Sequence, residues 1–145
     1  MNTQWNTRFM DLARHVSGWS KDPSKKVGAV IVNDNKQVLS MGYNGFPRGI
    51  DDSHGKYTNK GLKRLMICHA ERNALDNAFV SVEGATLYAT LHPCNECAKS
   101  IIQRGIKTVV TYDYDHKDMD MLNAYNFDTT QRLFDEAGVQ LLLLR

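Results

Sequence analysis

The chain has 145 residues, 42% of them hydrophobic and 23% charged, and a formal net charge of +2 at pH 7. This length and composition predict one domain spanning residues 1–145 and exclude a disordered or collagen-like chain. The near-balanced charge argues against a nucleic-acid-binding protein, and no apolar run approaches the about 20 residues of a membrane helix. The N-terminus lacks a signal-peptide pattern, so we expect a cytoplasmic location, in the cell or, for a viral chain, in its host cell.

The first half of the chain predicts a helix followed by a hairpin. Apolar residues recur at helical spacing over residues 3–19, and Asp22-Pro23 ends that pattern. Residues 27–32 and 38–43 are apolar and β-branched with turn residues between them, which indicates two antiparallel strands. The glycine-rich stretch that follows, residues 44–62, predicts a long loop that is functional or mobile.

Helices and strands alternate in the second half. We expect a helix over 68–78, a strand over 85–91, a helix opened by Pro93 and ended by Gly105, a strand over 106–112, a helix over 129–137 and a strand over 139–144. Strands that alternate with helices lie parallel to one another. Together with the hairpin, this order predicts an α/β fold, a three-layer α/β/α sandwich around a mixed five-stranded sheet.

Two short motifs predict a metal site. The first is His69-Ala70-Glu71 and the second is Pro93-Cys94-Asn95-Glu96-Cys97. Zinc takes His nitrogen and Cys thiolate ligands, and three protein ligands leave a fourth position for water, as in catalytic sites. We therefore predict His69, Cys94 and Cys97 as Zn²⁺ ligands, and Glu71 as the general acid and base that moves the proton of the bound water.

A structural zinc site is the alternative, with Cys68 as a fourth ligand. Cys68 and His69 are adjacent, and neighbours on a helix point about 100° apart, so one ion would be hard for both to reach. Since three cysteines cannot all pair and no export signal is present, we expect reduced thiols and a packing role for Cys68.

The wider sequence resembles the deoxycytidylate deaminases of the cytidine deaminase superfamily over nearly its whole length. The resemblance rests on Ser20-Lys21-Asp22-Pro23, on Gly42-Tyr43-Asn44-Gly45-Phe46-Pro47-Arg48-Gly49, and on the extended motif Cys68-His69-Ala70-Glu71-Arg72-Asn73-Ala74. It implies a cytidine deaminase-like fold and the hydrolysis of dCMP to dUMP and ammonia. Water activated by the metal would attack C4 of cytosine, while Glu71 protonates N3 and then the departing amine.

The resemblance also implies substrate contacts. Asn44 would hydrogen-bond the deoxyribose or base, although plain turn chemistry also explains an Asn-Gly pair. A monophosphate needs positive charge, for which Lys25 or Lys26 and His116 or Lys117 are candidates, while Tyr112 and Tyr114 offer hydroxyls or stacking. The segment 112–120 is rich in Asp, however, which would repel a phosphate.

Regulation is a further implication of the resemblance. Such enzymes are hexamers activated by dCTP and inhibited by dTTP, with Mg²⁺ on the triphosphate, so we expect a homo-oligomer and most simply a hexamer. The residues that resemble the effector site are Gly42, Tyr43, Asn44, Gly45, Arg48, Gly49, Asp51, Asp52 and His54. The alternative is a loop that only admits substrate.

Three other functions share parts of this pattern. A tRNA adenosine deaminase has the same zinc motif but should carry a basic flank, which this sequence lacks. A deaminase of a free nucleoside or base remains open because the motif does not report on the phosphate. A nucleotide-binding regulator with an inactive site is disfavoured because His69, Glu71, Cys94 and Cys97 are all intact.

Overall fold

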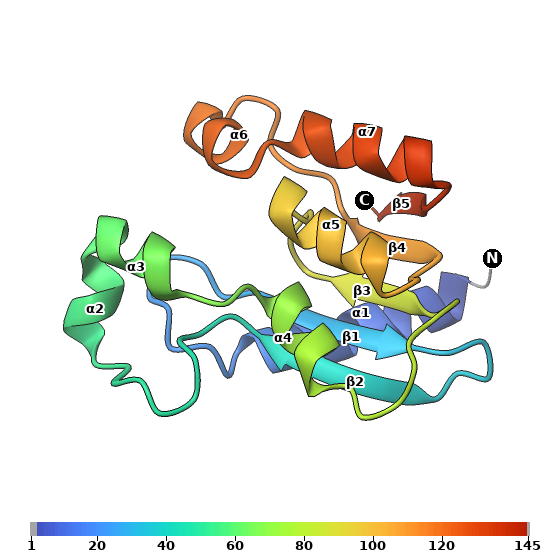
Figure 1. The fold of residues 1–145 in the computed structure, drawn as a ribbon, viewed down its shortest axis with the longest axis horizontal. Helices are drawn as coiled ribbons and strands as arrows, with labels where there is room; N and C mark the ends of the chain where they lie inside the picture. Colours follow the sequence, from blue (N-terminus) through green and yellow to red (C-terminus); the bar gives the residue numbers. More distant parts are fainter. Residues whose placement is uncertain (1–2, 145) are drawn as a thin grey trace.

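A computed structural model describes residues 3–144; Met1, Asn2 and Arg145 lie outside the described part. One five-stranded sheet runs through it in the order β2–β1–β3–β4–β5 (Figure 1). Strand β1 pairs antiparallel with β2 on one side and with β3 on the other. Strands β3, β4 and β5 are parallel to one another. The strands are β1 (Gly28–Val32), β2 (Val38–Tyr43), β3 (Thr86–Ala89), β4 (Thr108–Tyr112) and β5 (Gln140–Leu144). The predicted mixed sheet is confirmed.

Helices cover both faces of the sheet. On one face α1 (Thr3–Ser17) buries Phe9, Met10 and Ala13 against residues of β1, β3 and β4. On the other face lie α4 (Ala70–Asn77), α5 (Asn95–Gln103) and α7 (Phe127–Ala137), which share a second core with Ile31, Leu87 and Val109 (Figure 1). Strand residues alternate between the two cores because successive side chains point to opposite faces. The predicted three-layer α/β/α sandwich is confirmed.

Two glycines set the spacing of the layers. A Cβ on Gly42 of β2 would lie 2.4 Å from the backbone nitrogen of Ala74 in α4. A Cβ on Gly28 of β1 would lie 2.0 Å from the backbone oxygen of Ala13 in α1. Only glycine permits such close approach of backbones, so these positions fix how deeply α4 and α1 sit on the sheet.

Two segments differ from the sequence prediction. The stretch 44–62 is not a continuous loop, because it contains α2 (His54–Thr58) and leads into α3 (Lys60–Met66), whose first turn is capped by the side chain of Asn59. A further helix, α6 (Met119–Tyr125), precedes α7 and is capped by Asp118. Neither α3 nor α6 has a buried residue. Each is also only seven residues long, which is too short for an apolar helical period to be distinguished in the sequence.

The described residues include no helix that combines the length and the apolar character needed to cross a membrane.

Candidate metal centre and active site

The three predicted ligands meet where α4 and α5 begin. His69 is the residue before the first turn of α4, and Cys94 holds the same position before α5. Cys94 Sγ accepts a hydrogen bond from the backbone N–H of Cys97, one turn later, at 3.4 Å. Free N–H groups and the helix dipole at this end of α5 favour the thiolate form of Cys94.

The donor atoms are close enough for one ion. His69 Nδ1 lies 3.4 Å from Cys94 Sγ and 3.4 Å from Cys97 Sγ, and the three ligand atoms all lie within 4.8 Å of one another. In a tetrahedral zinc site with ordinary bond lengths, a nitrogen and a sulfur ligand are about 3.6 Å apart. The donor set and its spacing therefore fit Zn²⁺.

The two thiols differ in acidity. The hydrogen bond from Cys97, together with the neighbouring His69, lowers the pKa of Cys94 to about 4. The same contact with Cys94, burial and the nearby Glu71 raise the pKa of Cys97. The hydrogen bond to Cys94 also raises the pKa of His69. Without a metal, these shifts favour a Cys94 thiolate beside a protonated His69, and a bound cation would displace the His69 proton.

Glu71 lies beside the ligands without belonging to them. It is in the first turn of α4, is 4% exposed, and its carboxyl group contacts the Cys97 thiol. Burial raises the pKa of Glu71, and the charge of His69 opposes that rise. A buried carboxyl group with a raised pKa next to a metal site can both accept and return a proton.

Cys68 has a different environment. Its backbone pairs with Gly45, with Gly45 N donating to Cys68 O at 3.1 Å and Cys68 N donating to Gly45 O at 2.8 Å. Among residues 3–144, the candidate ligand group contains His69, Cys94 and Cys97 but not Cys68. The backbone bridge joins the 44–62 segment to the residue before the metal ligand.

A cleft of about 780 Å³ opens over the candidate ligands. Its walls come from α3 on one side and from α6 on the other, with Tyr125 of α6 placing its ring 6.0 Å from that of His69 at 75°. His92, two residues before Cys94, also lines it and is 3% exposed. Burial lowers the pKa of His92, which keeps this ring neutral. Sequence reasoning missed Tyr125, because α6 is too short for its apolar period to be distinguished, and His92, although it directly precedes Pro93.

Asn44 lines the cleft and is 5% exposed. Its side-chain oxygen accepts from Val27 N at 2.8 Å, and its side-chain nitrogen donates to Lys25 O at 2.9 Å and to Asp22 at 3.4 Å. Asn44 therefore holds the segment before β1 in place at the cleft wall. The turn interpretation does not describe this residue, because its side chain bonds to a segment about twenty residues earlier in the chain.

Asp22 anchors the same wall and was not recognised as a site residue in the sequence. It is 1% exposed and pairs with Lys63 of α3 at 3.1 Å. It also accepts hydrogen bonds from Ser24 N at 2.9 Å and Lys25 N at 3.3 Å. Burial by itself raises the pKa of Asp22, but these contacts outweigh burial and hold the pKa below its usual value. Helix α3 is thereby tied to the segment before β1.

The structure does not bring the four other predicted substrate residues into the cleft. Lys26 donates to Ser20 O, and Tyr112 packs on the α1 face, where Arg14 lies 5.7 Å from its ring centre. His116 is exposed and pairs with Asp113 at 3.2 Å, and Lys117 is exposed nearby. Lys25, the alternative to Lys26, does line the cleft. Tyr112 lies away from the cleft because successive side chains of β4 point to opposite faces of the sheet, and Tyr112 points to the face opposite the metal ligands.

The predicted effector residues form a chain of contacts from β2 to α2. Tyr43 O accepts from Asn73 of α4, and Arg48 donates to Asn77 of α4 at 3.1 Å. The remaining members lie as follows: Gly42 against α4, Gly45 paired with Cys68, Gly49 at a φ of 84°, Asp51 bonded to Ser53 N, Asp52 paired with Lys21, and His54 opening α2. The segment is therefore bonded to the helix that follows His69.

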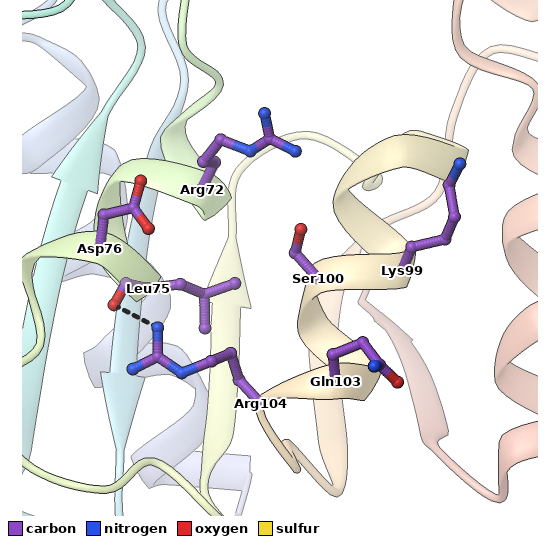
Figure 2. A pocket seen from close by; sticks show the side chains of 7 residues that line it. All are labelled: Arg72, Leu75, Asp76, Lys99, Ser100, Gln103 and Arg104. Carbon is purple, nitrogen blue, oxygen red and sulfur yellow. Dashed lines mark hydrogen bonds between the residues drawn. The ribbon is translucent and has the colours of Figure 1, made fainter.

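A smaller hollow of about 260 Å³ lies between α4 and α5, away from the ligand atoms (Figure 2). In it Arg104 donates to the backbone oxygen of Leu75 at 3.0 Å, which Figure 2 draws as a dashed line. This bond joins the end of α5 to the end of α4. The two helices that carry the ligands are thus connected at the ends distant from the ligands.

Known proteins share both the sequence and the fold. Residues 3–113 match the family model described as the cytidine and deoxycytidylate deaminase zinc-binding region. Deoxycytidylate deaminases of Pongo abelii and Homo sapiens are each 39% identical over 142 residues, covering 94% of this chain and 77% of theirs. The dCMP deaminase of cyanophage S-TIM5, solved with dCMP and dUMP, superimposes with a TM-score of 0.77 at 28% identity over 99% of both chains. The chain belongs to the cytidine and deoxycytidylate deaminase family.

Proposed function

We propose that this protein hydrolyses dCMP to dUMP and ammonia, with Zn²⁺ held by His69, Cys94 and Cys97. The observation that carries the proposal is the buried Glu71 beside three donor atoms in zinc geometry, on the wall of a cleft large enough for a nucleotide. The substrate is suggested by relatives that are named for it and that match 94% of this chain.

When bound, Zn²⁺ supplies a Lewis acid that makes water nucleophilic at neutral pH. Glu71 would take one proton from that water and deliver it to N3 of cytosine, and would then take the second proton, left on the oxygen now bonded to C4, and deliver it to the amine, which leaves as ammonia while the C4 carbonyl forms. Its burial keeps bulk water from competing for the proton. His92 and Tyr125 would border the ring of the base, and Asn44 would hold the adjoining cleft wall that faces the sugar.

Turnover of dCMP, deoxycytidine and cytidine by the metal-loaded protein tests the assignment. We expect dCMP to have the highest kcat/KM of the three, with dUMP and ammonia released from it in equal amounts. A kcat/KM for dCMP no higher than that for deoxycytidine would contradict it. Chelation followed by addition of Zn²⁺ should abolish and then restore the activity.

Regulation and assembly are further parts of the proposal. We infer that the protein is a homo-oligomer, with a hexamer favoured. Its activity is raised by dCTP and lowered by dTTP, and each triphosphate binds with Mg²⁺ at the segment from Gly42 to His54. In support, that segment contacts α4 through Arg48–Asn77 and the residue before His69 through Gly45–Cys68. Saturation curves that are unchanged by either triphosphate would contradict the regulatory part, and light scattering gives the subunit number. A cytoplasmic location remains a prediction.

A further inference from the structure

The two rims of the cleft carry opposite charge. The α6 rim places Asp118 and Asp120 at the opening, whereas the α3 rim places Lys60, Lys63 and Arg64 there. Of these cations Lys63 is already neutralised, since Asp22 accepts from it at 3.1 Å and Ser24 Oγ at 2.9 Å. An anionic group that enters the cleft is therefore favoured at the α3 rim and repelled at the α6 rim.

Lys60 and Arg64 are separated by one helical turn, so both side chains lie on the same side of α3. Among the residues that the structure describes, neither has a carboxylate within 4.0 Å. Burial raises the pKa of Tyr125 and the charge of Arg64 opposes that rise, which places Arg64 within electrostatic range of the ring beside His69. Arg64 also precedes His69 by five residues, so their Cα atoms are at most about 18 Å apart.

Lys25 supplies a third cation from the segment before β1, which the Asp22–Lys63 pair ties to α3. Its backbone is fixed on both sides, with the N–H bonded to Asp22 and the carbonyl oxygen accepting from Asn44. Within residues 3–144, the hydrogen-bond partner of its ammonium group is the thioether of Met121 in α6, a weak acceptor at 3.9 Å. A half-buried ammonium group on a fixed backbone, with no strong acceptor, is well placed to bind a ligand. The remaining cation that lines the cleft is Arg72, whose charge lowers the pKa of Glu96 and which also borders the smaller hollow between α4 and α5.

We propose that Lys25, Lys60 and Arg64 form the subsite for the 5′-phosphate of the nucleotide, and that they, rather than Lys26, His116 or Lys117, distinguish nucleotide from nucleoside. The assignment rests on the proposed function for the identity of the base. The phosphate accepts from the Lys25 ammonium group and from the Arg64 guanidinium group, with Lys60 adding charge at the rim. The base then extends toward Glu71, and Asn44 lies between the two ends of the substrate, because it bonds directly to the backbone of Lys25.

The test uses Lys25→Met and Arg64→Met in the zinc-loaded protein, with Lys99→Met as the matched control. Lys99 is an exposed lysine of α5 that pairs with Glu96 and does not line the cleft. We expect each rim variant to lower kcat/KM for dCMP by about 10- to 100-fold, since a hydrogen bond to a charged group is lost. The kcat/KM for deoxycytidine should stay within about twofold, and Lys25→Arg should restore most of the dCMP turnover.

Equilibrium binding of dUMP and deoxyuridine provides a second readout that needs no catalysis. The rim variants should weaken dUMP binding and leave deoxyuridine binding unchanged. An equal loss for nucleotide and nucleoside, no loss for either, or a selective loss in Lys26→Met or Lys117→Met instead would each overturn the assignment. A wild-type protein that binds dUMP through this rim but does not deaminate dCMP would refute the proposed function while leaving the subsite intact.

Discussion

The metal-ligand corner, which consists of His69, Cys94, Cys97 and the adjacent Glu71, is built differently from the two rims of the cleft. The ligands lie at the starts of α4 and α5, which bury four and three residues respectively in a core shared with the sheet. The rims are α3 and α6, which bury none and are held by caps and by the Lys63–Asp22 pair. The candidate metal ligands, which must stay within fractions of an ångström of one another, are thus placed on packed elements, and the charged groups that line the cleft opening are placed on lightly packed ones.

The largest expected effect is at the corner itself. Glu71→Gln keeps the shape of the side chain and removes its capacity to accept a proton, so kcat should fall by about 10²- to 10⁴-fold. Zinc content, measured by atomic emission, should stay near one per chain because Glu71 is not among the donor atoms. Glu96→Gln is the matched control, as Glu96 lies in the same cleft but is exposed and paired with Lys99. Full activity in Glu71→Gln would remove Glu71 from the mechanism.

Gly42→Ala tests whether the corner depends on the packing beneath it. The new Cβ would lie 2.4 Å from Ala74 N and 2.7 Å from Ala70 O, and backbone atoms cannot rotate away. Urea denaturation should show a free energy of unfolding lower by about 3 kcal/mol. Gly55→Ala is the control, because nothing lies within 4 Å of its Cβ position. Equal stability of the two variants would show that α4 is free to shift on the sheet.

Asp22→Asn tests how the α3 rim is held. It leaves Lys63, whose side chain is 15% exposed, without its carboxylate, and we expect a loss of about 2 kcal/mol at pH 7. Since the folded pKa of Asp22 is depressed, its stabilisation is present above the unfolded pKa of about 3.9 and is lost as pH falls through the folded value. The stability difference between wild type and variant should therefore shrink at pH 3. A difference that is independent of pH would contradict the ion pair.

The smallest effect is expected in the hollow of Figure 2. Arg104→Met removes the bond to Leu75 O while keeping an unbranched apolar side chain, so the free energy of unfolding should fall by about 1 kcal/mol. If the bond also sets the spacing of the ligand helices, zinc release to a chelator should become faster. Gln103→Met, at the neighbouring exposed position, is the control. If neither the free energy of unfolding nor the rate of zinc release changes, the Arg104–Leu75 hydrogen bond neither stabilises the fold nor sets the spacing of α4 and α5.

Sequence reasoning recovered the elements that carry apolar periodicity and missed those that do not. The sheet, α1, α4, α5 and α7 were predicted because buried faces repeat along the chain, with ends displaced by at most two residues. Helices α2, α3 and α6 were not, because their positions depend on caps at Asn59 and Asp118 and on contacts with distant segments. The metal-ligand group was predicted from two short sequence motifs, whereas Tyr125, Asp22 and Lys63 belong to no such motif and were not predicted as site residues.

The sequence by itself determined the chemistry of the corner. His69, Glu71, Cys94 and Cys97 occur in two short motifs whose spacing at helix starts fixes which groups meet. Only the tertiary structure decided which charges face the cleft. Lys25 and Lys26 are adjacent, yet one lines the cleft and the other bonds to Ser20, while Tyr112 points to the α1 face. The physical reason is that a side chain's direction is set by the register of its strand or segment against neighbours far away in the chain, which local sequence does not encode.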